Sequence, residues 1–322
     1  MTAAGASPTG HANGKLILLG EHAVVWGAPA LAVAIEREVR AVGRRGTEGG
    51  PWLEMLGSRH RADGRSADGI ARAFAALLEA AGAGGDLSIQ VAGELPAGVG
   101  LGFSAAAGVA IARALEGVGP ALAAEQVRTS AMAWERVFHG NPSGVDVAAA
   151  MGSGLIRFTR ADGPAALATE APLALCVGLT GVRSATKDMV GRVASLRDRE
   201  PERVGRCVEQ IGRLVEQAVD ALSGADWPTL GSLMDQNQAL LERLDVSTST
   251  LATLCTCARD AGALGAKLTG AGGGGAVVAL GGTGRSGRQV GAQVIAAWRK
   301  RGWDGFVTEV ARPGGHGSGG QR

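Results

Sequence analysis

The chain has 322 residues, with 32 basic and 30 acidic side chains and a net charge of +2 when histidines are neutral. This balance gives no electrostatic footprint for a nucleic acid or an anionic membrane. Because 46% of the residues are hydrophobic, a disordered chain is also excluded. The length exceeds that at which one core usually stops growing, so two domains are expected. The basic residues are nearly all arginines, and the four lysines are Lys15, Lys187, Lys267 and Lys300.

Three features of the sequence each exclude a class of protein: the cysteine spacing, the N-terminus and the apolar runs. The four cysteines are Cys176, Cys207, Cys255 and Cys257, and their spacing predicts neither a disulfide scaffold nor a zinc site. The N-terminal segment lacks the basic and apolar regions of a secretory signal. No apolar run approaches the roughly 18 residues of a membrane helix. We therefore expect a soluble cytoplasmic protein, with a flexible tail at 313–322.

The predicted elements of the first half alternate between strands and helices. Strands are expected at 15–19, 28–36, 39–42, 87–91 and around 156–158. Helices are expected at 66–81, 104–115 and 125–138. A polar break, Gly20-Glu21-His22, separates the first two strands. A loop from Arg160 to Pro172 is expected to end this half.

The second half continues the alternation. Strands are expected at 173–179, 276–280 and 306–310, and helices at 188–198, 201–223, 227–244, 248–261 and 286–301. The class is therefore α/β, in the α+β two-domain form.

The segment from Pro96 to Leu115 carries the strongest chemical signal. Its glycines at 98, 100 and 102 let backbone N–H groups approach a ligand closely. The loop leads directly into a helix, whose free N–H groups and positive dipole end favour a phosphate. Ser104 lies at the helix start, where it either caps the helix or ligates a metal.

Two further segments add polar groups and glycines. In Ala133 to Gly152, Glu135 lies in a helix and Asp146 follows a glycine loop, where it is a candidate helix N-cap or functional carboxylate. In Ala266 to Leu280, five glycines form either a permissive turn or backbone that passes close to a bound group. Three glycine loops, a lysine, a serine and two carboxylates together suggest phosphoryl transfer, which depends on positioning and charge neutralisation.

Four segments resemble the GHMP kinases, and among them the mevalonate kinases. They read GKLILLGEHAVVWGAPALAVAI from Gly14, ELPAGVGLGFSAAA from Glu94, ERVFHGNPSGVD from Glu135 and KLTGAGGGG from Lys267. The segment from Thr180 to Val190 and the helix of Asn237 are also similar. The motifs occur in order over nearly residues 14–280. The resemblance identifies the chain as a family member.

The resemblance implies a fold, a division of the chain and a reaction. It implies an N-terminal mixed α/β domain that binds ATP, a C-terminal ferredoxin-like domain, and an active site between them. We expect these domains at 1–170 and 171–312. The implied reaction transfers the γ-phosphoryl group of ATP to the 5-hydroxyl of mevalonate, giving 5-phosphomevalonate for isoprenoid biosynthesis.

The resemblance also assigns roles by position. Asp146 is the general base toward the substrate hydroxyl, and Lys15 lowers the pKa of that hydroxyl and neutralises developing charge. Ser104 and Glu135 are the expected ligands of Mg²⁺, which prefers oxygen. The expected triphosphate-binding residues, besides Lys15, are Gly98, Val99, Gly100, Leu101, Gly102, Phe103 and Ser104. The expected contacts to mevalonate, besides Asp146, are Glu21 and His22; a buried structural histidine is the alternative for His22.

One departure and several rivals remain open. The family loop usually reads G-L-G-S-S, whereas Phe103 replaces the first serine here. Phosphomevalonate kinase is the nearest rival, although it should carry extra cations at the acceptor pocket. The decarboxylase of the same pathway is a second rival, and a non-catalytic nucleotide or metabolite sensor on the same fold is a third. A homodimer is the usual state in the family.

Overall fold

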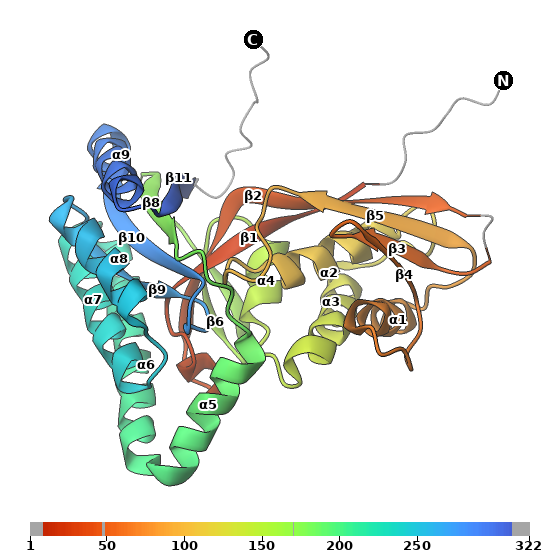
Figure 1. Ribbon diagram of the computed structural model, residues 1–322, viewed down its shortest axis with the longest axis horizontal. Coiled ribbons are helices and arrows are strands. Elements are labelled where there is room, and N and C mark those ends of the chain that lie inside the picture. The colour runs from red at the N-terminus through yellow and green to blue at the C-terminus, as the bar shows by residue number, and fades with distance from the viewer. Residues whose placement is uncertain (1–8, 47–48, 170, 311–322) are drawn as a thin grey trace.

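The computed structural model describes residues 9–46, 49–169 and 171–310, so the tail predicted at 313–322 lies outside the described residues. In this part of the chain two sheets form, one in each half of the sequence. Figure 1 shows them side by side, with the helices of the first half beneath their sheet and those of the second half at the other side of the molecule. No helix among these residues is long and apolar enough to cross a membrane.

The first sheet is built on two long antiparallel strands, β1 (Thr9–Leu19) and β2 (Ala30–Arg45). One edge of β2 pairs with β1, and the other edge pairs with β6 and then β5 along its length. The remaining order is β4-β3-β5-β2-β6-β7. The other strands are β3 (Trp52–Met55), β4 (Ser58–Arg61), β5 (Leu87–Gly93), β6 (Leu155–Thr159) and β7 (Gly163–Leu167).

Helices α1 (Gly69–Ala81), α2 (Phe103–Ala114), α3 (Ala124–His139) and α4 (Val145–Met151) pack with this sheet, and a short 3₁₀ helix, η1 (Ala23–Trp26), follows β1. Local sequence explains α1 well. The Asp68 side chain accepts a hydrogen bond from the backbone N–H of Ile70 at 2.8 Å, which caps the helix. Gly82 ends it in the left-handed conformation. Its apolar face is buried at Phe74, Leu77 and Leu78.

The second sheet is antiparallel in the order β11-β8-β10-β9. Its strands are β8 (Leu173–Leu179), β9 (Gly265–Thr269), β10 (Ala276–Thr283) and β11 (Asp304–Val310). Its helices are α5 (Thr186–Arg199), α6 (Pro201–Ser223), α7 (Trp227–Arg243), α8 (Ser249–Asp260) and α9 (Gly284–Lys300). The mixed α/β class expected from the sequence is confirmed.

The sequence missed short or exposed elements. The β3–β4 hairpin was not predicted, because its strands have four residues each and β4 is largely exposed. The predicted loop from Arg160 to Pro172 contains β7, an exposed edge strand that tolerates Pro164. The two strands predicted at 28–36 and 39–42 form the single strand β2. Helix α4 and strand β9 were also missed; both are short.

The two halves are joined by packing as well as by the chain. One contiguous buried cluster draws hydrophobic residues from both sheets. Helix α6 contacts η1, β1 and β2, and strand β11 contacts β2. A smaller cluster lies within the first half alone and joins Val145, Ala148 and Ala149 of α4 to Ile17 of β1 and to β2 and β6. The junction between the halves is therefore fixed by buried contacts on several elements.

Candidate active site

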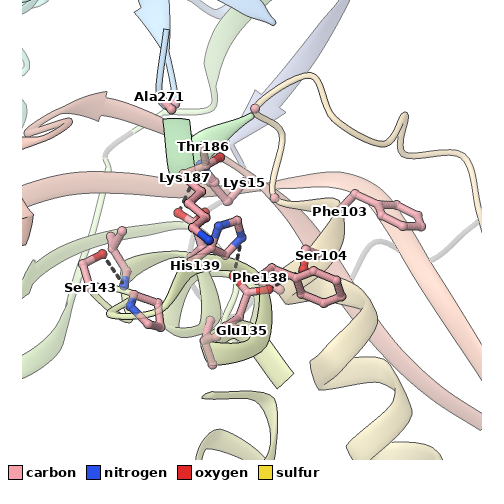
Figure 2. Close-up of a pocket in the computed structure, with 18 of the residues that line it drawn as sticks. Lys15, Phe103, Ser104, Glu135, Phe138, His139, Ser143, Thr186, Lys187 and Ala271 are labelled. Atoms are coloured by element: carbon pink, nitrogen blue, oxygen red, sulfur yellow. Dashed lines mark hydrogen bonds and ion pairs between the residues drawn. The ribbon is translucent and has the colours of Figure 1, made fainter. Parts of the chain in front are cut away.

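A cavity of about 520 Å³ opens at this junction. Its walls are the loop at 97–105, the turn at 21–25, the end of α3 with the loop into α4, the first turn of α5 and the glycine run at 270–271. Figure 2 shows side chains from these separate segments converging on one space. The three sequence segments that carry chemistry therefore meet in one place.

The glycine loop is shaped by backbone conformations that favour glycine. Gly98, Gly100 and Gly102 have φ values of 78°, 82° and 78°. A Cβ atom on Gly102 would lie 2.7 Å from Cγ of Lys15. The backbone N–H of Lys15 donates to the carbonyl oxygen of Leu101 at 2.9 Å, so the loop is fastened to β1. Helix α2 starts at Phe103 without a side-chain cap, which leaves N–H groups at its start available to an anion.

The second glycine run supports this loop directly. A Cβ atom on Gly100 would lie 3.0 Å from the carbonyl oxygen of Thr269, and one on Gly275 would lie 3.0 Å from that of Val99. The glycines therefore allow two backbones to pack against each other. The glycine run at 270–275 therefore packs against the loop at 98–102, and Gly270 and Ala271 also line the cavity. Whether this backbone passes close to a bound group, as the sequence suggested, stays a prediction.

Lys15 and Asp146 form the central ion pair, with 3.1 Å between Nζ and Oδ1. The Lys15 side chain is 3% exposed and that of Asp146 is 36% exposed. Asp146 lies in the first turn of α4, and the N-cap is Gly144, so the N-cap interpretation of Asp146 is wrong. The small cluster beneath α4 holds this turn against β1. The carboxylate is thus held by its lysine and still open to the cavity.

Ser104 and Glu135 meet in the same cavity. The Ser104 hydroxyl donates to Oε1 of Glu135 and accepts from Nε1 of Trp134 at 3.2 Å. Ser104 therefore does not cap α2. Burial raises the pKa of the Glu135 carboxyl to about 7, and the nearby Asp146 charge adds to the rise. His139 Nε2 lies 3.5 Å from Oε2 of Glu135. Figure 2 shows the two side chains pointing toward each other.

This donor set fits Mg²⁺. A hydroxyl and a carboxylate oxygen side by side are hard ligands. The buried Glu135 carboxylate lies near the like charge of Asp146, and a divalent cation would relieve that repulsion. Among the described residues no group of three or more His, Cys, Asp or Glu could hold a metal. A cation here would therefore complete its coordination with phosphate oxygens and water.

Glu21 and His22 border the cavity in different ways. His22 has φ 60° and ψ −50°, a strained conformation for a residue with a side chain, worth about 1–3 kcal/mol. Its Nε2 lies 2.9 Å from the carbonyl oxygen of Ala271, while its buried Nδ1 has no hydrogen-bond partner among the described residues. Burial lowers the pKa of this imidazole to about 4. Glu21 is buried and paired with Lys267 and Asn237.

Several cavity residues were not predicted to act there. Lys187, in the first turn of α5, lines the cavity and forms no ion pair with another described residue. His139 lines the same wall as Glu135. The Arg160 guanidinium donates to the carbonyl oxygens of Val25 and Pro142 at 3.1 and 3.0 Å, joining two cavity segments. The sequence offered a signal for Lys187, because it is one of only four lysines and lies in a motif segment. It offered none for His139 or Arg160.

The GHMP kinases N terminal domain model matches residues 68–154, and the GHMP kinases C terminal model matches residues 218–302. A mevalonate kinase of Aeropyrum pernix is 36% identical over 281 residues, covering 84% of this chain and 87% of that protein.

Two solved structures are also similar. L. major mevalonate kinase in complex with R-mevalonate is 30% identical, with a TM-score of 0.78 over 95% of this chain and 96% of that one. Streptococcus pneumoniae phosphomevalonate kinase, solved with phosphomevalonate and AMPPNP, is 19% identical, with a TM-score of 0.76 over 94% of this chain and 99% of that one. The second likeness concerns the fold alone.

Proposed function

The chain belongs to the GHMP kinases, in their mevalonate kinase branch, and we propose that it transfers the γ-phosphoryl group of ATP to the 5-hydroxyl of mevalonate. The observation that carries this proposal is the Lys15–Asp146 pair, which faces a cavity bordered by a glycine loop and by a buried carboxylate. These are the parts that phosphoryl transfer needs.

Asp146 accepts the proton of the mevalonate hydroxyl while the hydroxyl oxygen bonds to the γ-phosphorus and ADP leaves. Its exposure to the cavity allows a substrate to reach the carboxylate, and general-base catalysis requires that reach. Lys15 neutralises charge on the oxygens of the transferred group. Because the lysine is nearly buried, its charge acts in a poorly screened setting.

Ser104 and Glu135 would hold Mg²⁺. When bound, the ion neutralises charge on the phosphate oxygens of ATP. The pKa of Glu135 near 7 means that its carboxyl ionises in the physiological range, and a cation favours the ionised form.

The nucleotide fits a polar loop and an apolar wall. Residues 98–104 provide backbone N–H groups for the triphosphate. Beyond them the cavity is lined by apolar side chains suited to the base: Met55, Leu56, Ile70, Phe103 and Phe138. Figure 2 shows the Phe103 ring turned away from Lys15. Phe103 thus fits the base wall better than a phosphate contact.

The acceptor fits the space between Asp146 and the turn at 21–25. His22 offers a polar edge there, and it is the proposed contact to the mevalonate carboxylate and hydroxyls. Glu21, proposed with it from the resemblance, borders the same space from a sealed position.

A coupled ADP-release assay across mevalonate, phosphomevalonate, galactose and homoserine tests the proposal. We expect turnover with mevalonate and at least a hundredfold lower kcat/KM for the others. Lys187, which forms no ion pair with another described residue, favours a phosphorylated acceptor. Preferred turnover of phosphomevalonate would replace the proposal. ATP binding without turnover of any acceptor would instead indicate a sensor.

Two further parts of the proposal rest on the family resemblance. They are a homodimeric state and a cytoplasmic location. Light scattering of the purified chain tests the first, and fractionation of the source cells tests the second.

A further inference from the structure

A second lysine–carboxylate pair lies behind the acceptor side of the cavity. Lys267 Nζ, from β9, contacts Oε1 of Glu21, from the turn after β1, and both side chains are 0% exposed. Asn237 Nδ2, from α7, donates to Oε2 of Glu21 at 3.2 Å. The carboxylate of Glu21 is thus held on both oxygens by the second half of the chain.

The contact continues along β9 and the glycine run after it. Thr269 Oγ1 accepts from the backbone N–H of Ile17 at 3.0 Å and donates to its carbonyl oxygen at 3.1 Å. The carbonyl oxygen of Ala271 contacts His22. Residues 267, 269 and 271 therefore each contact the segment from Ile17 to His22, the first two from β9 and the third from the loop that follows it. Figure 1 shows β9 beside β1 at the junction of the halves.

Stability is a weak reason for a pair buried this deeply. Removing both charges from water is costly, and apolar replacement of such a pair is often neutral or stabilising. Burial raises the pKa of Glu21 and lowers that of Lys267, as expected when each charged form is desolvated. What the pair supplies is a fixed direction for Glu21, the residue before the strained His22.

We propose that Lys267 is a positioning residue for the acceptor. With Asn237 it fixes Glu21, and through Glu21 it holds His22 in the positive-φ conformation in which the residue lines the cavity. A strained backbone persists only where its surroundings over-determine it, and here the surroundings hold the residue from both sides. This inference rests on the proposed function, since the acceptor defines the readout.

The double variant Glu21→Gln/Lys267→Met tests the role without leaving a lone buried charge. We expect it to fold, with a melting temperature within about 5 °C of the wild type. We expect KM for mevalonate to rise at least tenfold, while KM for ATP stays within about twofold. A KM for mevalonate within twofold of the wild type would overturn the proposal, as would an equal rise in both constants.

A double-mutant cycle with His22→Ala separates positioning from direct contact. If the pair acts through His22, the double variant changes KM for mevalonate by less than threefold in the His22→Ala background. An undiminished tenfold effect there means that Glu21 contacts the substrate itself, and the proposal is then wrong.

Neighbouring residues of α7 provide a matched pair that keeps the ion pair intact. Asn237→Leu removes a hydrogen bond to Glu21, and we expect KM for mevalonate to rise about threefold. Gln238→Met removes the contact between its Oε1 and the backbone N–H of Leu268, which does not involve Glu21. We expect this control to lower the melting temperature without changing KM. Equal KM effects in both variants would contradict the proposal.

The wild type is assayed first, so that failure of the proposed function is recognised separately. If another acceptor is turned over in place of mevalonate, the proposed function fails. The same KM comparison is then made with that acceptor, and the same outcomes decide the role of Lys267.

Discussion

The molecule contains two lysine–carboxylate pairs near one cavity, and they differ in access to solvent. In Lys15–Asp146 the carboxylate is 36% exposed, whereas in Lys267–Glu21 both side chains are fully buried. The first carboxylate can meet a substrate and exchange a proton. The second is buried on both sides of the pair, and we propose that it holds its neighbours in place. The same two residue types therefore support different roles, and burial decides which role each pair has.

The largest effect is expected when the Lys15–Asp146 pair is broken. Asp146→Asn keeps the size of the side chain but removes its ability to accept a proton, so we expect kcat to fall by about 10³ or more. ATP binding should stay nearly intact. Single-turnover kinetics and a nucleotide-binding titration measure the two quantities. Unchanged turnover would remove the general-base role.

We expect the free energy of unfolding to fall in acid because of the buried His22. The pKa of His22 is about 4 in the folded chain and near 6.5 in the unfolded chain, so between these values the unfolded state binds the extra proton. The contribution of His22 to the free energy of unfolding is full above pH 6.5. Up to about 3 kcal/mol of it is lost as the pH falls to 4.

Denaturant unfolding of the wild type and of His22→Gln, at pH 6.5 and at pH 4, measures this contribution. We expect a smaller loss of stability in the variant. Acidic groups such as Glu135, whose raised pKa acts in the opposite direction, are common to both proteins and cancel in the difference. Equal losses in both proteins would show that His22 titrates normally in the folded state.

Lys15→Arg sharpens the comparison at the open pair. The Lys15 stem lies against Gly102, where a single Cβ atom would come within 2.7 Å, and its side chain is 3% exposed. The planar guanidinium group is broader than the compact ammonium group and does not fit the narrow space around Lys15. We expect kcat to fall by about 10². Lys300→Arg, on the exposed end of α9, is the control and should leave kcat unchanged.

Sequence patterns predicted the elements that have long apolar periods, such as α6 and the buried strand β8. They predicted the glycine loop at 98–102 because its glycines lie close together in the chain. Neither ion pair could be predicted from spacing. Lys15 and Asp146 were brought together only by resemblance, and Lys267 reaches Glu21 across 246 residues. The Lys267–Glu21 pair depends on how β9 docks against the first half, and the Lys15–Asp146 pair depends on how α4 packs on β1. No local pattern encodes either contact.

The smallest effect is expected for a substitution of Phe103, at the start of α2. Phe103 replaces the serine usual in the family loop, and it is partly buried against the core. Because the proposed contacts to the triphosphate are backbone N–H groups, Phe103→Ser should leave kcat within about tenfold, or 1.4 kcal/mol of barrier. KM for ATP should rise modestly, since the base loses part of an apolar wall. Steady-state kinetics with varied ATP measures both constants. A large fall in kcat would show that the Phe103 ring itself orders the glycine loop. The site around Lys15 and Asp146 would then depend on side-chain packing as strongly as the buried Lys267–Glu21 pair does.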